Sequence, residues 1–449
     1  MEDDSLRSSE RARAACTQPD FRRLFAHAQR YRVILHYVLG GLALHASISV
    51  MLRTLTALFF LTTTLVVAQQ SQWTPPPAIE IAKLLGKDNA LASKKVRSSY
   101  GPGGLAEGKN RWIEETTLLI AVTADEPVTA LKSDGSKLGD LTRLDDEGLY
   151  VFCEDIGNHR DFSYKLKTAS GRIIGSNTVK IEYYPYPEES KKHPHNPQGT
   201  LHKHRWSDSK VYPETERDFL VYIPEQYEVS KPAALMVFQD GLRHADVNAS
   251  GGLRAPLVFD NLIASGEMPV TIGLFINPGS VTGQPEGSKP RNRSVEYDSL
   301  GDSYATFLLE EIIPFIVNKH GLNLSNDPAQ WAIAGGSSGC ACAWTAAWER
   351  PDKFGKVLGW VGTFTDIRGA NAYPSLIRKT ERKPIRAALL GERNDLDNQF
   401  GNWPLANRQM ETALAFMNYD YRYWWGDGFH GSRHAAVMLP EMLKWLWSE

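Results

Sequence analysis

The sequence predicts an α/β fold in the C-terminal half of the chain and a small β-sandwich before it. Beyond about residue 206, apolar strands alternate with longer helical segments, which is typical of a mainly parallel sheet covered by helices. Over roughly residues 85–185, short alternating runs are instead separated by Asp-Gly and Gly-Asn turns. A chain of 449 residues also exceeds what one hydrophobic core usually organises, so two domains are expected.

The composition limits the classes of function. Hydrophobic residues make up 42% of the chain, charged residues 23%, and the formal net charge is -2. These values exclude a disordered chain and the strong basic excess of a nucleic-acid-binding surface. We therefore expect small-molecule chemistry and no nucleic-acid partner.

The N-terminal region has the layout of a signal peptide. Met51 and Arg53 precede an apolar run over residues 55–67, and small residues place cleavage after Ala68. Met51 is the expected true start, which makes residues 1–50 an upstream extension. The prediction is a secreted or periplasmic protein without stable membrane insertion after cleavage. The alternative is a membrane hairpin or anchor formed by residues 33–50 and 55–67, which its histidines and Arg53 disfavour.

The processed chain is expected to fold as an immunoglobulin-like β-sandwich over residues 69–185, a linker over 186–205 and an α/β domain over 206–449. In the sandwich, strands are predicted over residues 116–122, 128–131, 148–153, 161–167 and 178–184. In the α/β domain, strands are predicted over 219–223, 233–238, 271–276, 331–334, 356–361, 385–390 and 421–425, and helices over 304–319, 338–350, 405–417 and 433–447.

Neither the histidines nor the cysteines predict a metal site or a disulfide. Histidines at 193, 195, 202 and 204 lie in or next to the Pro-rich linker without an acid or cysteine to complete a site. Cys16 would be lost on processing. Cys340 and Cys342, two residues apart on a predicted helix, point to different sides. We expect no metal and no cofactor.

A nucleophile motif follows the predicted strand at 331–334. Gly335-Gly336-Ser337-Ser338-Gly339 fits a sharp turn between that strand and a helix of small residues, and such a turn projects the serine hydroxyl above the sheet edge. Ser337 is therefore the predicted nucleophile of an α/β-hydrolase fold.

The partners of Ser337 follow from the chain order Ser, acid, His of this fold class. Only His430 and His434 lie beyond Ser337, and we prefer His430 as the base because it follows a predicted strand directly. The loop after residues 385–390 offers Glu392, Asp395 and Asp397. Asp395 is the first choice for the acid and Asp397 the alternative.

The oxyanion hole needs backbone N–H groups. The residue after the nucleophile, Ser338, supplies one of them. The turn after the strand at 233–238 supplies the other, from Gly241 or Leu242.

Together these residues resemble the putative-esterase family, which includes enterochelin esterases, feruloyl esterases and esterase D. The resemblance covers roughly residues 205–449 and rests on the motif at 238–241, the run at 293–298, the nucleophile motif, the loop at 391–398 and residues 428–430. It implies hydrolysis of a carboxylic ester of a small molecule or glycan, of carbohydrate, phenolic or siderophore type.

Three further residues are candidates for substrate contact. Arg293 and Glu296 lie where active-site loops gather, although an ion pair that clamps the loop explains them equally well, and His434 can line the pocket. Two other functions stay open: acyl transfer to an acceptor by the same fold, and glycan binding by the sandwich with an inert hydrolase domain.

Overall fold

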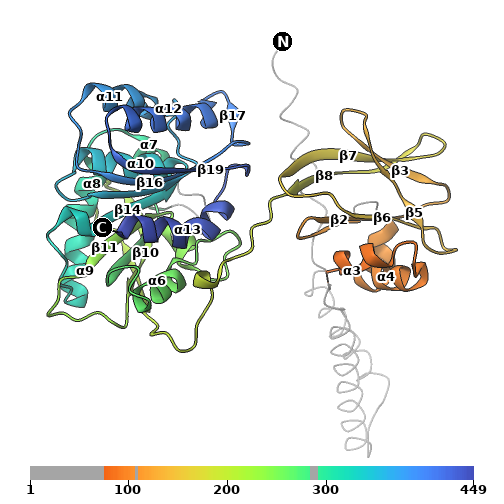
Figure 1. Ribbon diagram of the computed structural model, residues 1–449, viewed down its shortest axis with the longest axis horizontal. Helices are drawn as coiled ribbons and strands as arrows, with labels where there is room; N and C mark the ends of the chain where they lie inside the picture. Colours follow the sequence, from red (N-terminus) through yellow and green to blue (C-terminus); the bar gives the residue numbers. More distant parts are fainter. Residues whose placement is uncertain (1–74, 107–109, 284–291, 449) are drawn as a thin grey trace, which may run out of the picture. The chain divides into compact units, whose positions relative to one another are not determined.

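The computed structural model describes residues 75–106, 110–283 and 292–448 (Figure 1). The predicted signal peptide, the upstream extension and Cys16 lie outside these residues. Within the described part of the chain, no helix is both long and apolar enough to span a bilayer.

Two four-stranded antiparallel sheets form the β-sandwich. One sheet has the order β1-β2-β6-β5 and the other β4-β3-β7-β8. The apolar side chains of β2, β3, β6, β7 and β8 fill a shared core between the sheets. The strands are β1 (Asn110–Glu114), β2 (Thr117–Thr123), β3 (Val128–Lys132), β4 (Lys137–Asp140), β5 (Thr142–Arg143), β6 (Leu149–Asp155), β7 (Arg160–Thr168) and β8 (Ile173–Ile181).

Two helices before β1 were not predicted. α3 (Ala78–Leu84) and α4 (Asn89–Ala106) precede residue 116, where the first predicted strand begins, and the sequence indicated no element there. Ile81 and Val96 of these helices pack with Leu119 and Val151 on the outer face of β2 and β6. The six residues of β2 that precede Thr123 are therefore all buried, because both faces of the strand are covered.

A nine-stranded mixed sheet forms the centre of the second half, with the order β13-β10-β12-β11-β14-β15-β16-β19 and β9 paired to β10. Strands β12 to β19 in this order are parallel, while β9 and β13 pair antiparallel with β10. The strands are β9 (Thr200–Trp206), β10 (Thr215–Ile223), β11 (Ala234–Gln239), β12 (Thr271–Ile276), β13 (Ser280–Val281), β14 (Trp331–Gly336), β15 (Lys356–Trp360), β16 (Arg386–Glu392) and β19 (Asp420–Gly426).

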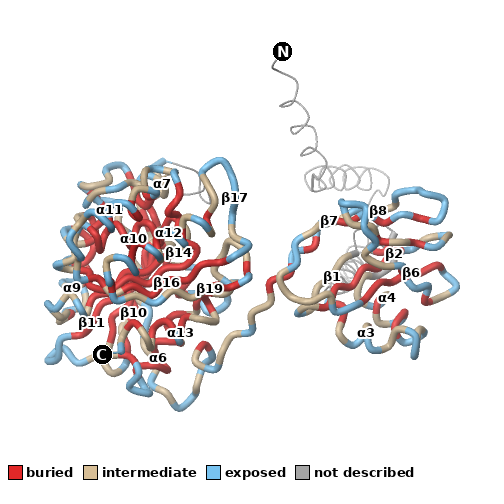
Figure 2. The backbone as a smooth tube through the Cα atoms, turned by 45° about the horizontal axis from the view of Figure 1, so that its top comes forward, coloured by how far each residue is buried: buried red, intermediate tan, exposed pale blue. Residues whose placement is uncertain are grey.

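Helices cover both faces of this sheet, and the buried residues gather around its central strands (Figure 2). α5 (Gly241–Ala245), α6 (Ala255–Ala264) and α13 (Arg433–Trp447) pack on one face. The other face carries α7 (Arg293–Asp298), α8 (Ser303–Phe307), a π-helical turn (Leu308–Ile312), α9 (Ile313–His320), α10 (Ser338–Glu349), α11 (Tyr373–Lys379) and α12 (Trp403–Phe416). This is the predicted α/β-hydrolase fold.

One strand begins inside the predicted linker over residues 186–205. Residues 200–206 form β9, which pairs with β10 over its whole length. The prediction failed because β9 is an edge strand in which exposed and half-buried residues alternate, so it lacks the apolar residues by which the other strands were recognised. The helices α6, α7 and α11 and the short hairpin of β17 (Asp397–Asn398) and β18 (Gly401–Asn402) were also not predicted.

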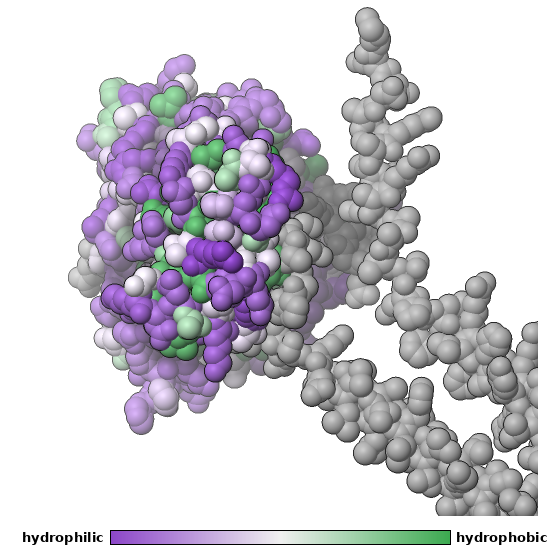
Figure 3. Space-filling model, turned by 90° about the vertical axis from the view of Figure 1, so that its right-hand side faces the viewer, coloured by the Kyte–Doolittle hydropathy of each residue, from purple (hydrophilic) through white to green (hydrophobic). Residues whose placement is uncertain are grey.

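The face drawn in Figure 3 is mainly hydrophilic, and its apolar side chains form small separate groups. Such a distribution is normal for a surface that contacts water.

Candidate active site

Four neighbouring parallel strands each deliver a side chain to one edge of the sheet. Ser337 follows β14, Thr363 follows β15, Asp395 follows β16 and His430 follows β19, and these strands are adjacent in that order. Because the carboxyl ends of parallel strands meet at the same edge, residues far apart in sequence converge there.

The turn at Ser337 is sterically demanding. Ser337 has φ 58° and ψ -125°, a strained conformation for a residue with a side chain. A Cβ on Gly335 would lie 2.4 Å from the backbone of Gly339, and a Cβ on Gly336 would lie 2.2 Å from Nε1 of Trp360. Only glycine fits at these two positions, so the motif is required for the chain to turn directly from β14 into α10.

Ser337, His430 and Asp395 form a continuous chain of hydrogen bonds. The Ser337 Oγ lies 2.9 Å from Nε2 of His430, and Nδ1 of His430 lies 2.5 Å from Oδ1 of Asp395. The Asp395 side chain is 1% exposed, and its Oδ1 also accepts the N–H of Leu396 at 2.6 Å. With the Nδ1 proton directed to Asp395, Nε2 is free to accept the proton of the serine hydroxyl.

The alternative acid lies elsewhere. Asp397 is exposed in β17, where it pairs with Asn402 of β18 rather than with a histidine. Of the two acids considered for the triad, the structure brings only Asp395 to His430.

The remaining acid and the remaining histidine form a second pair. Nδ1 of His434 lies 2.5 Å from Oε1 of Glu392, whose side chain is 1% exposed. The other oxygen of Glu392 accepts the N–H of Gly428 at 2.7 Å. Glu392 therefore ties the loop that carries His430 to the end of β16. His434 is engaged by this carboxylate rather than placed as a second base.

The sequence predicted no catalytic role for two residues that lie near the nucleophile. The Thr363 hydroxyl lies 3.1 Å from the Ser337 Oγ and 3.3 Å from Nε1 of Trp403. The Trp403 ring meets His430 edge-on at 5.8 Å between centroids. The position of Thr363, just beyond a predicted strand, was the signal that could have identified it.

The predicted donors of the oxyanion hole are backbone N–H groups at the starts of α10 and α5. Ser338 begins α10, and its N–H lacks an intrahelical acceptor because it belongs to the first turn. The Leu242 N–H donates to Oδ1 of Asn277 at 3.2 Å, whereas the Gly241 N–H has no hydrogen-bond partner among the described residues. Of the two candidates for the second donor, Gly241 is the one whose N–H is free.

The side chains of Arg293 and Glu296, in the run at 293–298, mainly form ion pairs within the protein. Arg293 donates to both oxygens of Asp240, with Nη2–Oδ2 at 2.8 Å and Nε–Oδ1 at 3.1 Å, and its side chain is 33% exposed. Glu296 forms a fully buried ion pair with Arg217 at 2.5 Å. The expectation that Glu296 contacts substrate is therefore wrong, since no part of its side chain is accessible. Arg293 remains a candidate.

Among the described residues, no cluster of three or more histidine, cysteine or acidic side chains is arranged to hold a metal ion. Cys153, Cys340 and Cys342 are free and buried. Burial raises the pKa of the Cys340 thiol to about 12, so this cysteine is chemically inert despite its position three residues after Ser337.

Comparison with known proteins supports an esterase. A family model described as "Putative esterase" matches residues 210–368. The fold is similar to the enterobactin esterase of Shigella flexneri, solved in the presence of enterobactin, with a TM-score of 0.51, 14% identity, and coverage of 76% of this chain and 96% of that chain.

The enterochelin esterase of Shigella flexneri gives a TM-score of 0.50 at 13% identity, with the same coverage. A ferulic acid esterase of Anaeromyces mucronatus gives 0.44 at 17% identity and covers 57% of this chain and 94% of that chain. No curated protein matches the sequence. The resemblance to putative esterases is confirmed over residues 210–368, and the comparisons support an esterase-type hydrolase.

Proposed function

We propose that this chain, whose residues 210–368 match the putative-esterase family, is a secreted serine esterase that cleaves a carboxylic ester through an acyl-enzyme at Ser337. The observation that carries the proposal is the continuous hydrogen-bond chain from Ser337 through His430 to the buried Asp395. A serine hydroxyl is a weak nucleophile at neutral pH, and this arrangement supplies the base that activates it.

The reaction begins when Ser337 attacks the ester carbonyl and His430 takes the hydroxyl proton. His430 then donates this proton to the leaving alkoxide, and Asp395 stabilises the positively charged imidazole. In the second step, His430 takes a proton from water, which attacks the acyl-enzyme and releases the acid. Asp395 stays ionised throughout.

Charge on the carbonyl oxygen is stabilised by the N–H groups of Ser338 and Gly241. Both belong to the first turn of a helix, and the partial positive charge at a helix N-terminus favours the oxyanion. Gly241 is pressed against β12, where a Cβ would lie 2.4 Å from Phe275 Cα. This close fit fixes the direction of the second donor.

The proposed substrate class rests on the resemblance to putative esterases and on the partly exposed Arg293. We propose a carbohydrate, phenolic or siderophore-type ester, with Arg293 beside the oxyanion hole as a contact for an acidic or hydroxyl-rich group. A screen of feruloyl, acetyl and siderophore-type esters on the purified protein identifies the preferred substrate. If the acyl group is transferred to an added sugar instead of to water, the protein is an acyltransferase rather than an esterase.

Replacement of the nucleophile tests the mechanism. Ser337→Ala is expected to lower kcat on an aryl ester by several orders of magnitude and to abolish labelling by a fluorophosphonate, while the melting temperature is retained. Ser265→Ala, at an exposed serine after α6, is the matched control and should behave as the wild type. Wild-type turnover or labelling in Ser337→Ala would refute the assignment.

The proposed export has its own test. N-terminal sequencing of the protein recovered outside the producing cell is expected to begin at Gln69 or a close neighbour. Recovery of residues 1–50 on the exported protein would contradict processing at Ala68.

A further inference from the structure

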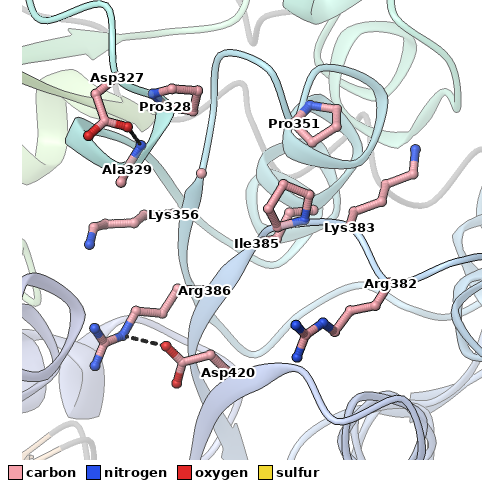
Figure 4. Close-up of a pocket in the computed structure, with 12 residues that line it drawn as sticks. Asp327, Pro328, Ala329, Pro351, Lys356, Arg382, Lys383, Ile385, Arg386 and Asp420 are labelled. Atoms are coloured by element: carbon pink, nitrogen blue, oxygen red, sulfur yellow. Dashed lines mark hydrogen bonds and ion pairs between the residues drawn. The ribbon is translucent and has the colours of Figure 1, made fainter. Parts of the chain in front are cut away.

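A basic cavity lies at the edge of the main sheet opposite Ser337. It measures about 520 Å³ and is lined by the amino ends of β15, β16 and β19 with the loops that precede them (Figure 4). Ser337 follows the carboxyl end of β14, which runs parallel to these strands. The cavity and the triad therefore lie at opposite ends of the strands. The proposed esterase reaction makes no use of it.

The charges at this edge are unbalanced. Four basic residues, Lys356, Arg382, Lys383 and Arg386, line the cavity, against two acidic ones, Asp327 and Asp420. The first residues of the three strands are direct neighbours, since Lys356 pairs with Arg386 and Arg386 pairs with Asp420. Like charges on neighbouring strands repel each other, and of these three neighbouring residues only Asp420 carries a negative charge.

That carboxylate is taken by Arg386. Nε of Arg386 lies 3.2 Å from Oδ2 of Asp420, and its terminal nitrogens donate to the carbonyl and hydroxyl oxygens of Ser448. Asp327 accepts the N–H of Ala329. In Figure 4 the Arg386 and Asp420 side chains face each other, and Lys356 lies above them.

Lys356 is left without an acceptor. The residue is only 8% exposed, and among the described residues its amine has no hydrogen bond or ion pair and rests 5.1 Å from the centre of the Trp447 ring. Burial and the neighbouring Arg386 lower the pKa of this amine to about 8, whereas Asp420 and Asp327 oppose the shift. A buried amine of this kind gains stability when an anion reaches it.

The two remaining cations are also free to bind an anion. Arg382 is exposed and donates to the carbonyl of Asn418, and Lys383 donates to the carbonyl of Trp348. Neither contacts a carboxylate among the described residues.

We propose that this cavity, which we call the amino-edge cavity, binds a compact anion of the phosphate or carboxylate class through Lys356 and Arg382. The anion supplies the acceptor that Lys356 lacks and offsets the repulsion between Lys356 and Arg386. The volume admits a phosphate group or a small dicarboxylate together with water.

Equilibrium dialysis of the full chain with radiolabelled inorganic phosphate, in a buffer of zwitterions at low salt, tests the site. We expect saturable binding of one phosphate per chain. Lys356→Met and Arg382→Gln should each weaken it about tenfold or more, because each removes a charge-assisted hydrogen bond. Lys379→Met, at an exposed lysine of α11, is the matched control and should leave the affinity unchanged.

Competition by succinate distinguishes the two ligand sources. Displacement of phosphate assigns the site to carboxylates as well, and its absence restricts the site to phosphates. Because Arg382 lies on an exposed loop, its variant is expected to fold even if Lys356→Met does not.

Chemical labelling gives a second measurement. Competitive acetylation of the lysines should show a Lys356 amine that phosphate protects and that titrates at higher pH when phosphate is present. Absence of saturable phosphate binding in the millimolar range, or equal affinity in the wild type and both variants, would overturn the proposal. The esterase activity is unaffected by either result, so the two proposals fail independently.

Discussion

Replacement of Asp395 by Asn is the sharpest perturbation of the proposed triad. The carboxylate is buried and has two neighbours, Nδ1 of His430 at 2.5 Å and the N–H of Leu396 at 2.6 Å, both on Oδ1. In Asp395→Asn, the amide oxygen can take the place of Oδ1 and keep both contacts, since both are made to that one atom. The neutral amide no longer supplies the negative charge that stabilises the protonated ring of His430.

The consequence is a base whose charged form is no longer stabilised. His430 can still accept the Ser337 proton across the 2.9 Å contact, but the imidazolium that forms lies beside a neutral amide instead of a carboxylate. We expect kcat to fall by about four orders of magnitude. This corresponds to about 5 kcal/mol of lost transition-state stabilisation. The melting temperature should change little, because the volume and the Leu396 bond are retained.

The assay is steady-state hydrolysis of an aryl ester, with Asp397→Asn as the matched control. Asp397 is the same residue type two positions on, but it lies exposed in the β17–β18 hairpin, and its variant should keep wild-type kcat. A loss smaller than about tenfold in Asp395→Asn, or a comparable loss in Asp397→Asn, would show that the reasoning about the acid is wrong.

Three other perturbations follow from the same geometry. His434→Gln removes one partner of Glu392, and we expect kcat to fall about tenfold with KM unchanged, because the loop bearing the base is held less firmly; a shift in KM alone would instead favour substrate contact. Gly336→Ala places a Cβ 2.2 Å from an indole nitrogen and should cost about 1–3 kcal/mol in urea unfolding, whereas Gly431→Ala, with nothing within 4 Å, should be neutral. The pKa of Lys356 is lowered to about 8 in the folded chain, so the unfolded chain binds more protons between there and the ordinary value of 10.5. The free energy of unfolding should therefore rise with pH over that window by up to about 3 kcal/mol, and Lys356→Met should remove the rise.

Much of the fold could be predicted because the buried strands have distinctive sequences. β11, β12 and β14 are continuous apolar runs, since parallel strands are covered on both faces, and they were placed to within a residue or two. The helices beginning at Ser338 and Arg433 were predicted for the same reason, from apolar positions that face the sheet.

The missed elements depend on contacts that a single sequence does not reveal. α3 is seven residues long, too short to be stable in isolation, and Ile81 is buried only because β2 and β6 present an apolar outer face. Glu296 was considered for substrate binding because it lies where active-site loops were expected to gather. Its actual partner, Arg217, is 79 positions away in sequence.

Chain order limited which residues could form the triad, and the distance that each side chain projects beyond the strand ends decided among them. Histidines 430 and 434 and the three acids at 392, 395 and 397 were all eligible by chain order. Glu392 is the last residue of β16 and lies in register with Gly426, so its carboxylate stays level with the strands and meets His434 at the start of α13. Asp395 lies three residues beyond the strand, and its carboxylate meets His430, whose ring reaches Ser337 immediately beyond β14. Only the pair that projects past the strand ends can reach a nucleophile that also projects past its strand. Glu392 and His434 can then only hold the loop that carries His430. This is why a much smaller effect is expected at His434 than at Asp395.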